Sequence, residues 1–205
     1  LCQRAILPTG PFLLTARCVV DTSDTIDVNR DAEFVPIQTV PDPILKYLIP
    51  SRYCQSDQLG GLARTIVGGV APGYPQVEAI TKWIHENVRY QYGTSNASTS
   101  ALETSQSREG VCRDMAHLGI ALCRAMNIPA RFVSGFLHEL DPMDLHAWFE
   151  AYVGVRWFTF DATQRNARGN RVAIGYGRDA ADVALLTHFG PLSLNELKVQ
   201  VRAAP

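Results

Sequence analysis

The stretch from Arg108 to Met126 constrains the fold of this chain more than any other. It opens with a glycine-containing loop, and from Cys112 onward apolar residues occupy nearly every side of the helical repeat. A helix that is apolar almost all round has to be buried. The sequence therefore predicts a central helix that begins at Cys112 and ends where Asn127 and Pro129 oppose its continuation.

Cys112 falls in the first turn of this predicted helix. The unpaired N–H groups and the helix dipole favour an anion there, so the position favours a thiolate. Downstream, His146 lies within residues 144–148 and Asp161 within residues 157–163. A cysteine, a histidine and an aspartate in this order are typical of a nucleophile, its base and the group that orients the base.

Hydrophobic periodicity divides the rest of the chain into helices and strands. Helices are predicted over residues 56–67 and 74–88, and a long loop over residues 93–107. From Ala130 onward the pattern is that of strands, at residues 130–137, 145–153, 156–160 and 197–202. Helices followed by strands, with the candidate nucleophile on a helix, predict an α+β fold rather than an alternating α/β one.

The N-terminal fifth has strand-like features of its own. Residues 12–20 are apolar and alternate so that Cys18 falls on the side expected to be buried, and residues 21–29 are polar and rich in turn formers. We expect residues 1–40 to form a small, partial β-module and residues 41–205 to form the catalytic domain.

Composition and charge exclude several classes of protein. The chain has 205 residues, of which 46% are apolar and 19% charged, which is ordinary for a globular protein. A net charge of −1 offers no positive surface for nucleic acid or an anionic membrane, so neither partner is expected. No apolar run approaches the roughly 20 residues of a membrane span. The five scattered cysteines predict a reducing, cytoplasmic location.

Several reactive residue types have a predicted structural role. Cys123 lies inside the apolar helix and is expected in the core, whereas Cys54 lies in a polar turn where it could be reactive. His85, His117 and His188 show no metal-ligand spacing and are expected to be structural. The glycines at positions 175 and 177 fit neither a P-loop nor a dinucleotide-binding pattern, so they predict a turn.

Strand geometry predicts that His146 and Asp161 meet. If the hairpin turns at Val153 and Gly154, His146 lies directly opposite Asp161, with the Cβ atoms about 4.5–5.5 Å apart. A turn shifted by one residue makes the two residues diagonal neighbours on the same face of the sheet. In either case the helix that begins at Cys112 needs only to pack its first turn against that face.

Four motifs in the chain resemble the bacterial transglutaminase-like superfamily. They occupy residues 110–117, 127–136, 145–150 and 157–163, and the resemblance extends upstream over residues 47–57 and downstream over residues 171–183. Members share a papain-like fold, so the resemblance implies that the nucleophile helix packs on an antiparallel sheet. It also implies that Cys112 is the nucleophile, His146 the base and Asp161 the orienting group, with no cofactor.

The expected chemistry assigns a step to each residue. The thiolate of Cys112 attacks an amide carbon, His146 takes the thiol proton and later protonates the leaving amine, and Asp161 holds the imidazole tautomer. The backbone N–H of Cys112 is a candidate oxyanion donor. A second donor stays open among Gln106, Tyr90, Gln91 and Tyr92. Candidate substrate contacts are Trp148 and His138.

The resemblance leaves the acyl acceptor open between water and an amine. We expect a cysteine peptidase or amidase acting on peptide or protein amides, because no tryptophan in residues 84–147 could wall off a dry amine channel. The alternatives are a cross-linking protein-glutamine γ-glutamyltransferase and a catalytically silent binding module. A zinc site of Cys112, His138 and His146 lacks standard ligand spacing, and no acidic cluster predicts a calcium loop.

Overall fold

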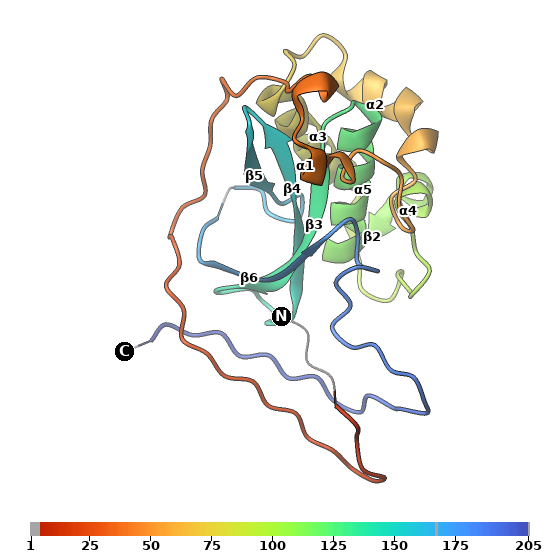
Figure 1. The fold of residues 1–205 in the computed structure, drawn as a ribbon, viewed down its shortest axis with the longest axis vertical. Coiled ribbons are helices and arrows are strands. Elements are labelled where there is room, and N and C mark those ends of the chain that lie inside the picture. The colour runs from red at the N-terminus through yellow and green to blue at the C-terminus, as the bar shows by residue number, and fades with distance from the viewer. Residues whose placement is uncertain (1–4, 167, 205) are drawn as a thin grey trace.

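The computed structural model describes residues 5–166 and 168–204 (Figure 1). Helices pack against one face of a four-stranded antiparallel sheet, which confirms the predicted α+β class. The helices are α1 (Asp42–Leu45), α2 (Gly60–Val67), α3 (Tyr74–Asn87), α4 (Ala101–Ser107) and α5 (Cys112–Ala125). The strands are β1 (Arg89–Tyr90), β2 (Glu109–Gly110), β3 (Ala130–Leu137), β4 (His146–Val153), β5 (Arg156–Phe160) and β6 (Arg171–Gly177).

Helix α5 is the central element that the sequence predicts. It contacts α2, α3 and α4 as well as strands β3 and β4, and most of its residues are buried. Asn127 follows it in the left-handed conformation, with φ of 59°, and ends the helix. Among the described residues, no helix has both the length and the apolar character needed to cross a membrane.

The sheet has the strand order β5-β4-β3-β6. On β4, Phe149 and Ala151 belong to the core that α5 shares, together with Phe158 and Phe160 of β5. A Cβ atom on Gly119 of α5 would lie 2.5 Å from the Phe149 ring, so only glycine lets the helix approach this closely. Helix α5, which begins at Cys112, therefore packs directly on the sheet, as predicted.

The C-terminal part of the chain differs from the prediction. The segment around Gly175 and Gly177, predicted as a turn, is the end of strand β6, which pairs with β3. Residues 197–202, predicted as a strand, form none. The physical reason is that a strand needs a neighbouring strand to bond its backbone groups. Residues of β6 find one at the free edge of β3, whereas residues 197–202 pair with no strand among the described residues.

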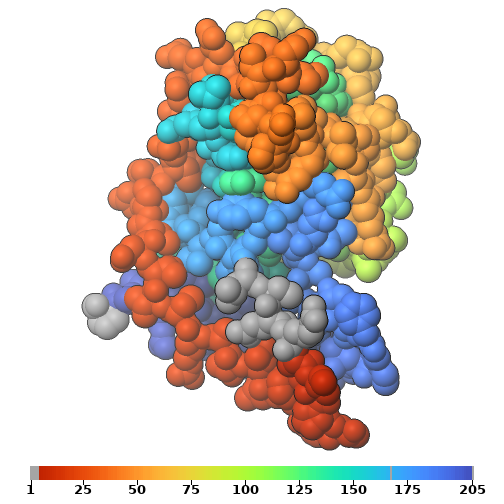
Figure 2. Space-filling model, in the orientation of Figure 1, coloured from red at the N-terminus to blue at the C-terminus, as the bar shows by residue number. Residues whose placement is uncertain are grey.

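The predicted N-terminal β-module is not confirmed by the part of it that the structure describes. Residues 5–36 contain no helix or strand, and Figure 1 shows them as an extended segment that runs past the sheet. In Figure 2 this red segment covers part of the molecular surface. Cys18, expected on a buried face, is exposed. A segment of alternating character becomes a strand only beside a hydrogen-bonded partner, which the described residues do not provide.

Helix α4 was missed within the predicted loop over residues 93–107. Ser100 caps it: the Ser100 hydroxyl accepts from the Glu103 amide, and the Glu103 carboxylate accepts from the Ser100 amide at 2.8 Å. This reciprocal pair is a capping box, and the Ser-x-x-Glu spacing is visible in the sequence. The helix leads the chain through Arg108 into β2 and then to Cys112.

Candidate active site

Three elements deliver Cys112, His146 and Asp161 to one place. Cys112 is the first residue of α5, His146 is the first residue of β4, and Asp161 directly follows β5. Because strand neighbours pair in register and α5 packs on β4, the start of the helix and the end of the hairpin lie together. All three candidate side chains thus come from the ends of regular elements, which hold them more firmly than a loop would.

His146 and Asp161 form a buried pair. The imidazole Nε2 donates to Asp161 Oδ2 over 2.8 Å, and the side chains are only 2% and 5% exposed. The hairpin turns one residue later than first expected, because Val153 pairs with Arg156. His146 and Asp161 are therefore diagonal neighbours rather than directly opposite, which is the second of the two predicted registers.

The environment of the pair favours its charged form. Burial by itself lowers the pKa of His146, but the hydrogen bond to Asp161 and the contact with Cys112 outweigh it and raise that pKa to about 9. Burial by itself raises the pKa of Asp161, but the hydrogen bond from His146 and the charge of Arg171 lower it to about 2. Asp161 is therefore a carboxylate, and His146 readily holds a proton.

The sulfur of Cys112 completes the contact. The charged imidazole donates to Asp161 through Nε2 and also has the Cys112 side chain as a hydrogen-bond acceptor. Because Asp161 takes Nε2, only Nδ1 of the ring is left to exchange a proton with the sulfur. This geometry can form a thiolate–imidazolium pair whose imidazolium is oriented by a carboxylate.

A cavity of about 640 Å³ opens beside Cys112 and His146. Of the candidate oxyanion or substrate residues, Tyr92 lines it, whereas Gln106, His138 and Trp148 do not. The Gln106 side chain is exposed on α4, and the Trp148 side chain is buried behind His146. The other lining residues include Tyr90, Gly93, Ser95, Val111, Arg113, Leu140, Asp141, Pro142, Asp144, Leu145, Thr163, Gln164 and Leu197.

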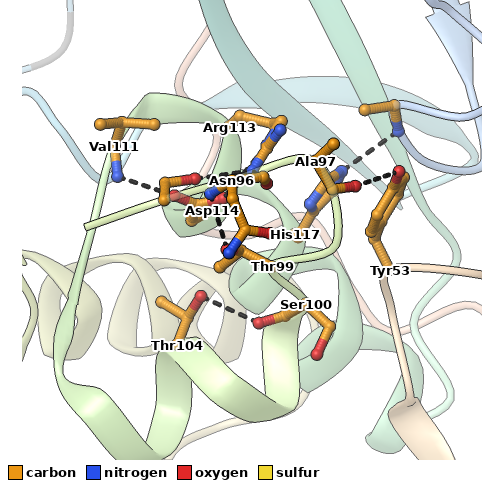
Figure 3. A network of polar contacts seen from close by, with 12 residues as sticks. Tyr53, Asn96, Ala97, Thr99, Ser100, Thr104, Val111, Arg113, Asp114 and His117 are labelled. Carbon is orange, nitrogen blue, oxygen red and sulfur yellow. Dashed lines mark hydrogen bonds and ion pairs between the residues drawn. The ribbon is translucent and has the colours of Figure 1, made fainter. Parts of the chain in front are cut away.

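Arg113 and Asp114 hold the loop that forms one wall of this cavity (Figure 3). Arg113 donates to Asp114, to the Ser95 hydroxyl at 2.6 Å and to the backbone oxygen of Asn96 at 2.6 Å. The Asp114 side chain is fully buried and accepts from the Val111 amide at 3.0 Å. The two residues after Cys112 therefore tie the start of α5 to the cavity wall.

Sequence reasoning missed two residues that contact Asp161. Thr163 donates to Asp161 Oδ1 through both its amide and its hydroxyl, at 3.0 and 2.7 Å. The Asp-Ala-Thr spacing is a known signal for this local turn. Arg171 Nη1 lies 2.9 Å from Asp161 Oδ2. No local signal indicates Arg171, because the contact joins strands at opposite edges of the sheet.

The other cysteines and histidines considered in the sequence, Cys54 and His117 among them, do not line this cavity. Cys54, predicted to be potentially reactive, is fully buried, and burial raises the pKa of its thiol to about 12. His117 is a buried residue of α5 whose ring lies between those of Tyr53 and Phe132, and burial lowers its pKa to about 3, so it is a neutral structural residue. Within the described residues, no group of three His, Cys, Asp or Glu side chains could hold a metal ion, so the zinc alternative gains no support.

Among the candidates for the second oxyanion donor, Tyr90 lines the cavity together with Cys112. It pairs with Gly110 in the short ladder of β1 and β2, and its hydroxyl lies against the Cys112 backbone. Burial, and then the neighbouring Cys112 charge, raise the pKa of this hydroxyl, so it stays protonated and can donate.

Replacing Tyr90 with phenylalanine is therefore expected to lower kcat by about 10²-fold, as for the loss of one oxyanion donor. KM should change little, because the donor acts on charge that develops only in the transition state. Steady-state kinetics of Tyr90→Phe and Tyr92→Phe measure this. A larger kcat loss for Tyr92→Phe would transfer the role to Tyr92.

Comparison with known proteins agrees with this geometry. The sequence pattern of the transglutaminase-like superfamily matches residues 60–162, about half of the chain, and this range contains Cys112, His146 and Asp161. The chain belongs to the transglutaminase-like superfamily. Members of this superfamily are typically cysteine enzymes.

A solved structure supports the same assignment. The crystal structure of a candidate cysteine protease from Cytophaga hutchinsonii matches this superfamily member with a TM-score of 0.72 and 44% sequence identity. The match covers 83% of this chain and 66% of that chain. At this level of similarity it confirms the transglutaminase-like fold.

Two curated relatives are uncharacterised mycobacterial proteins. The protein from Mycobacterium leprae is 34% identical over 119 residues, and the protein from Mycobacterium tuberculosis is 32% identical over 130 residues. These matches cover 54% and 55% of this transglutaminase-like chain but only 42% and 41% of the relatives. The chain thus spans less than half the length of the curated relatives it matches.

Proposed function

We propose that this transglutaminase-like domain is a cysteine peptidase or amidase that cleaves peptide or side-chain amides through a thioester on Cys112. The observation that carries the proposal is the contact of Cys112 with His146, whose Nε2 is bound to a buried carboxylate 2.8 Å away. This arrangement lies beside a cavity large enough for a peptide segment.

The reaction proceeds in two halves. The Cys112 thiolate attacks the amide carbon, and the oxyanion that forms is stabilised by the Cys112 amide and the Tyr90 hydroxyl. His146 then protonates the leaving amine, the C–N bond breaks and a thioester remains. In the second half neutral His146 takes a proton from water, and the resulting hydroxide attacks the thioester carbon. The acid is released and the sulfur leaves as a thiolate beside imidazolium.

Water is proposed as the usual acceptor because of the cavity lining. No tryptophan lines the cavity among the described residues: Trp148 is buried behind His146, and Trp157 lies elsewhere on the sheet. The wall combines tyrosines and polar side chains with apolar ones such as Val111, Leu140 and Leu145, so no bulky indole closes it off from solvent. A wet site favours attack by water, which is far more concentrated than any amine, and only a closed apolar channel would exclude it.

A partition experiment tests this choice. The enzyme is incubated with a glutamine-containing peptide and, separately, with a short peptide amide, each with and without a millimolar primary amine. We expect acid products to predominate in every mixture when they are quantified by mass spectrometry. Predominant amine adducts would instead establish a cross-linking transglutaminase. No turnover, combined with no covalent intermediate on Cys112, would favour the silent binding module.

A further inference from the structure

Arg171 contacts the same oxygen of Asp161 that His146 uses. Its Nη1 atom lies 2.9 Å from Asp161 Oδ2, and the two side chains are 7% and 5% exposed. The N–H groups of Nη1 are not aligned for a hydrogen bond to this oxygen, so the contact acts through charge. The Nε atom of Arg171 donates to the backbone oxygen of Arg168 at 2.9 Å, which holds the guanidinium in place.

The topology explains how Arg171 reaches this position. It begins β6, whereas Asp161 follows β5, and these strands form opposite edges of the sheet. Arg171 pairs with Leu137, and His146 pairs with Gly135, so the pleat places Arg171 and His146 on the same face. A Cβ atom on Gly135 would lie 2.1 Å from the Val172 oxygen, so only glycine allows this close approach of β6.

The guanidinium of Arg171 lies over the ring of Trp148. The Arg171 Cζ atom lies 5.0 Å from the centre of the Trp148 ring, and that ring is 6.0 Å from the ring of His146. Trp148 is 2% exposed, so it is a fixed surface on which both side chains rest. An arginine stacked on an aromatic ring has a defined orientation that a lysine would not reproduce.

We propose that Arg171 is a positioning residue, which holds the Asp161 carboxylate so that Oδ2 faces His146 and thereby makes β6 part of the catalytic apparatus. This inference rests on the proposed function, because it assigns Asp161 to the orientation of the base. It extends the site beyond residues 60–162, which match the superfamily pattern.

The carboxylate then has a fixed partner on each side. Oδ1 accepts from Thr163, and Oδ2 faces both His146 and Arg171. Removing one member of a buried charged group leaves the others uncompensated. Without Arg171, protonation of Asp161 becomes easier and its carboxyl group is freer to rotate away from the imidazole.

Two variants separate the charge of Arg171 from its shape. Arg171→Met keeps an unbranched side chain on Trp148 and removes the charge, and Arg171→Lys keeps the charge without the planar fork. Arg171→Met is expected to lower kcat by about 10- to 100-fold, the range for groups that orient a catalytic ligand, with KM close to wild type. Arg171→Lys is expected to recover only part of kcat.

A matched control lies on the same face of the sheet. Arg131 stacks on Trp157 with its Cζ atom 4.2 Å from the ring centre, and its Nε donates to Glu150 at 2.7 Å. Arg131→Met therefore removes an equivalent stacked arginine and its carboxylate pair without touching Asp161. It should leave kcat near wild type even if it lowers thermal stability.

The titration of the Asp161 carboxyl group distinguishes a positioning role from a purely structural one, because loss of a purely structural residue would leave this titration unchanged. It is followed by carbon NMR of isotope-labelled protein, with Asp161→Asn to assign the signal. We expect Arg171→Met to shift this titration to higher pH, and Arg171→Lys and Arg131→Met to leave it near that of the wild type.

Three results would overturn the proposal: wild-type kcat in Arg171→Lys, wild-type kcat in Arg171→Met, or an unchanged Asp161 titration in Arg171→Met. If Arg171→Met fails to fold, the kcat of Arg171→Lys decides. The titration requires no substrate. A wild-type protein that forms no thioester would therefore reject the proposed function, and the titration would still test the contact of Arg171 with Asp161.

Discussion

Replacing Cys112 with alanine should abolish turnover and the covalent thioester while the domain stays folded. Cys112 lies at the edge of the cavity and is only partly buried, so loss of its sulfur leaves the core packing of α5 intact. Removal of a nucleophile that works with its base typically lowers kcat by about 10⁶-fold. Intact-mass spectrometry after rapid quenching detects the acyl-enzyme, and thermal unfolding checks the fold.

Cys18 provides the matched control for this variant. It is an exposed free cysteine, so Cys18→Ala removes a thiol that is more accessible than that of Cys112 and that, among the described residues, has no histidine hydrogen-bonded to it. Cys18→Ala should retain full turnover. Alkylation by iodoacetamide at mildly acidic pH should label Cys112 faster than Cys18, because only the thiolate reacts. Turnover in Cys112→Ala close to that of wild type would eliminate Cys112 as the nucleophile.

Replacing Asp161 with asparagine should lower kcat by about 10⁴-fold, by analogy with the corresponding substitution in serine proteases. The amide keeps the size of the carboxylate, so the fold should persist. It removes the negative charge that Oδ2 presents to His146 Nε2 at 2.8 Å, so the imidazole loses both its fixed tautomer and the stabilisation of its charged form.

The pH profile gives this variant a second test. In the wild type the pKa of His146 is raised to about 9 from its ordinary 6.5, so the imidazolium of the free enzyme is lost as pH rises through about 9. The alkaline limb of kcat/KM should lie in that region. In Asp161→Asn it should move to lower pH. A variant whose alkaline limb stays in place would show that Asp161 does not stabilise the charged base.

Local pattern was enough to predict the central elements of the fold. The apolar character of residues 112–126 identified α5, and the alternation after Ala130 identified β3, β4 and β5. Hairpin geometry also predicted that His146 and Asp161 lie on one face, although the turn is one residue later than first expected. These features depend on neighbours that are close in sequence, so periodicity and turn chemistry report them.

Local sequence pattern did not predict which segments pair as strands at the edges of the sheet. Residues 12–20 and 197–202 alternate like strands but form none, whereas the glycine-containing β6 became a strand because β3 offered it a free edge. Whether a segment finds a partner depends on the assembled sheet rather than on its own residues. The prediction of a loop in place of helix α4 was wrong for another reason. The Ser-x-x-Glu spacing of its capping box, Ser100 and Glu103, is a local signal in the sequence that predicts a helix start.

The sequence by itself determined the superfamily, the helix that starts at Cys112 and the candidate triad, because each is written in contiguous motifs. Only the tertiary structure decided which side chains surround that triad. It excluded Gln106, His138 and Trp148 from the cavity lining and brought Arg171 to Asp161. The physical reason is that such placements depend on how helices and strands pack in space: the contact of Arg171 with Asp161, for example, joins residues from opposite edges of the sheet, and the spatial order of the strands does not follow their order along the chain.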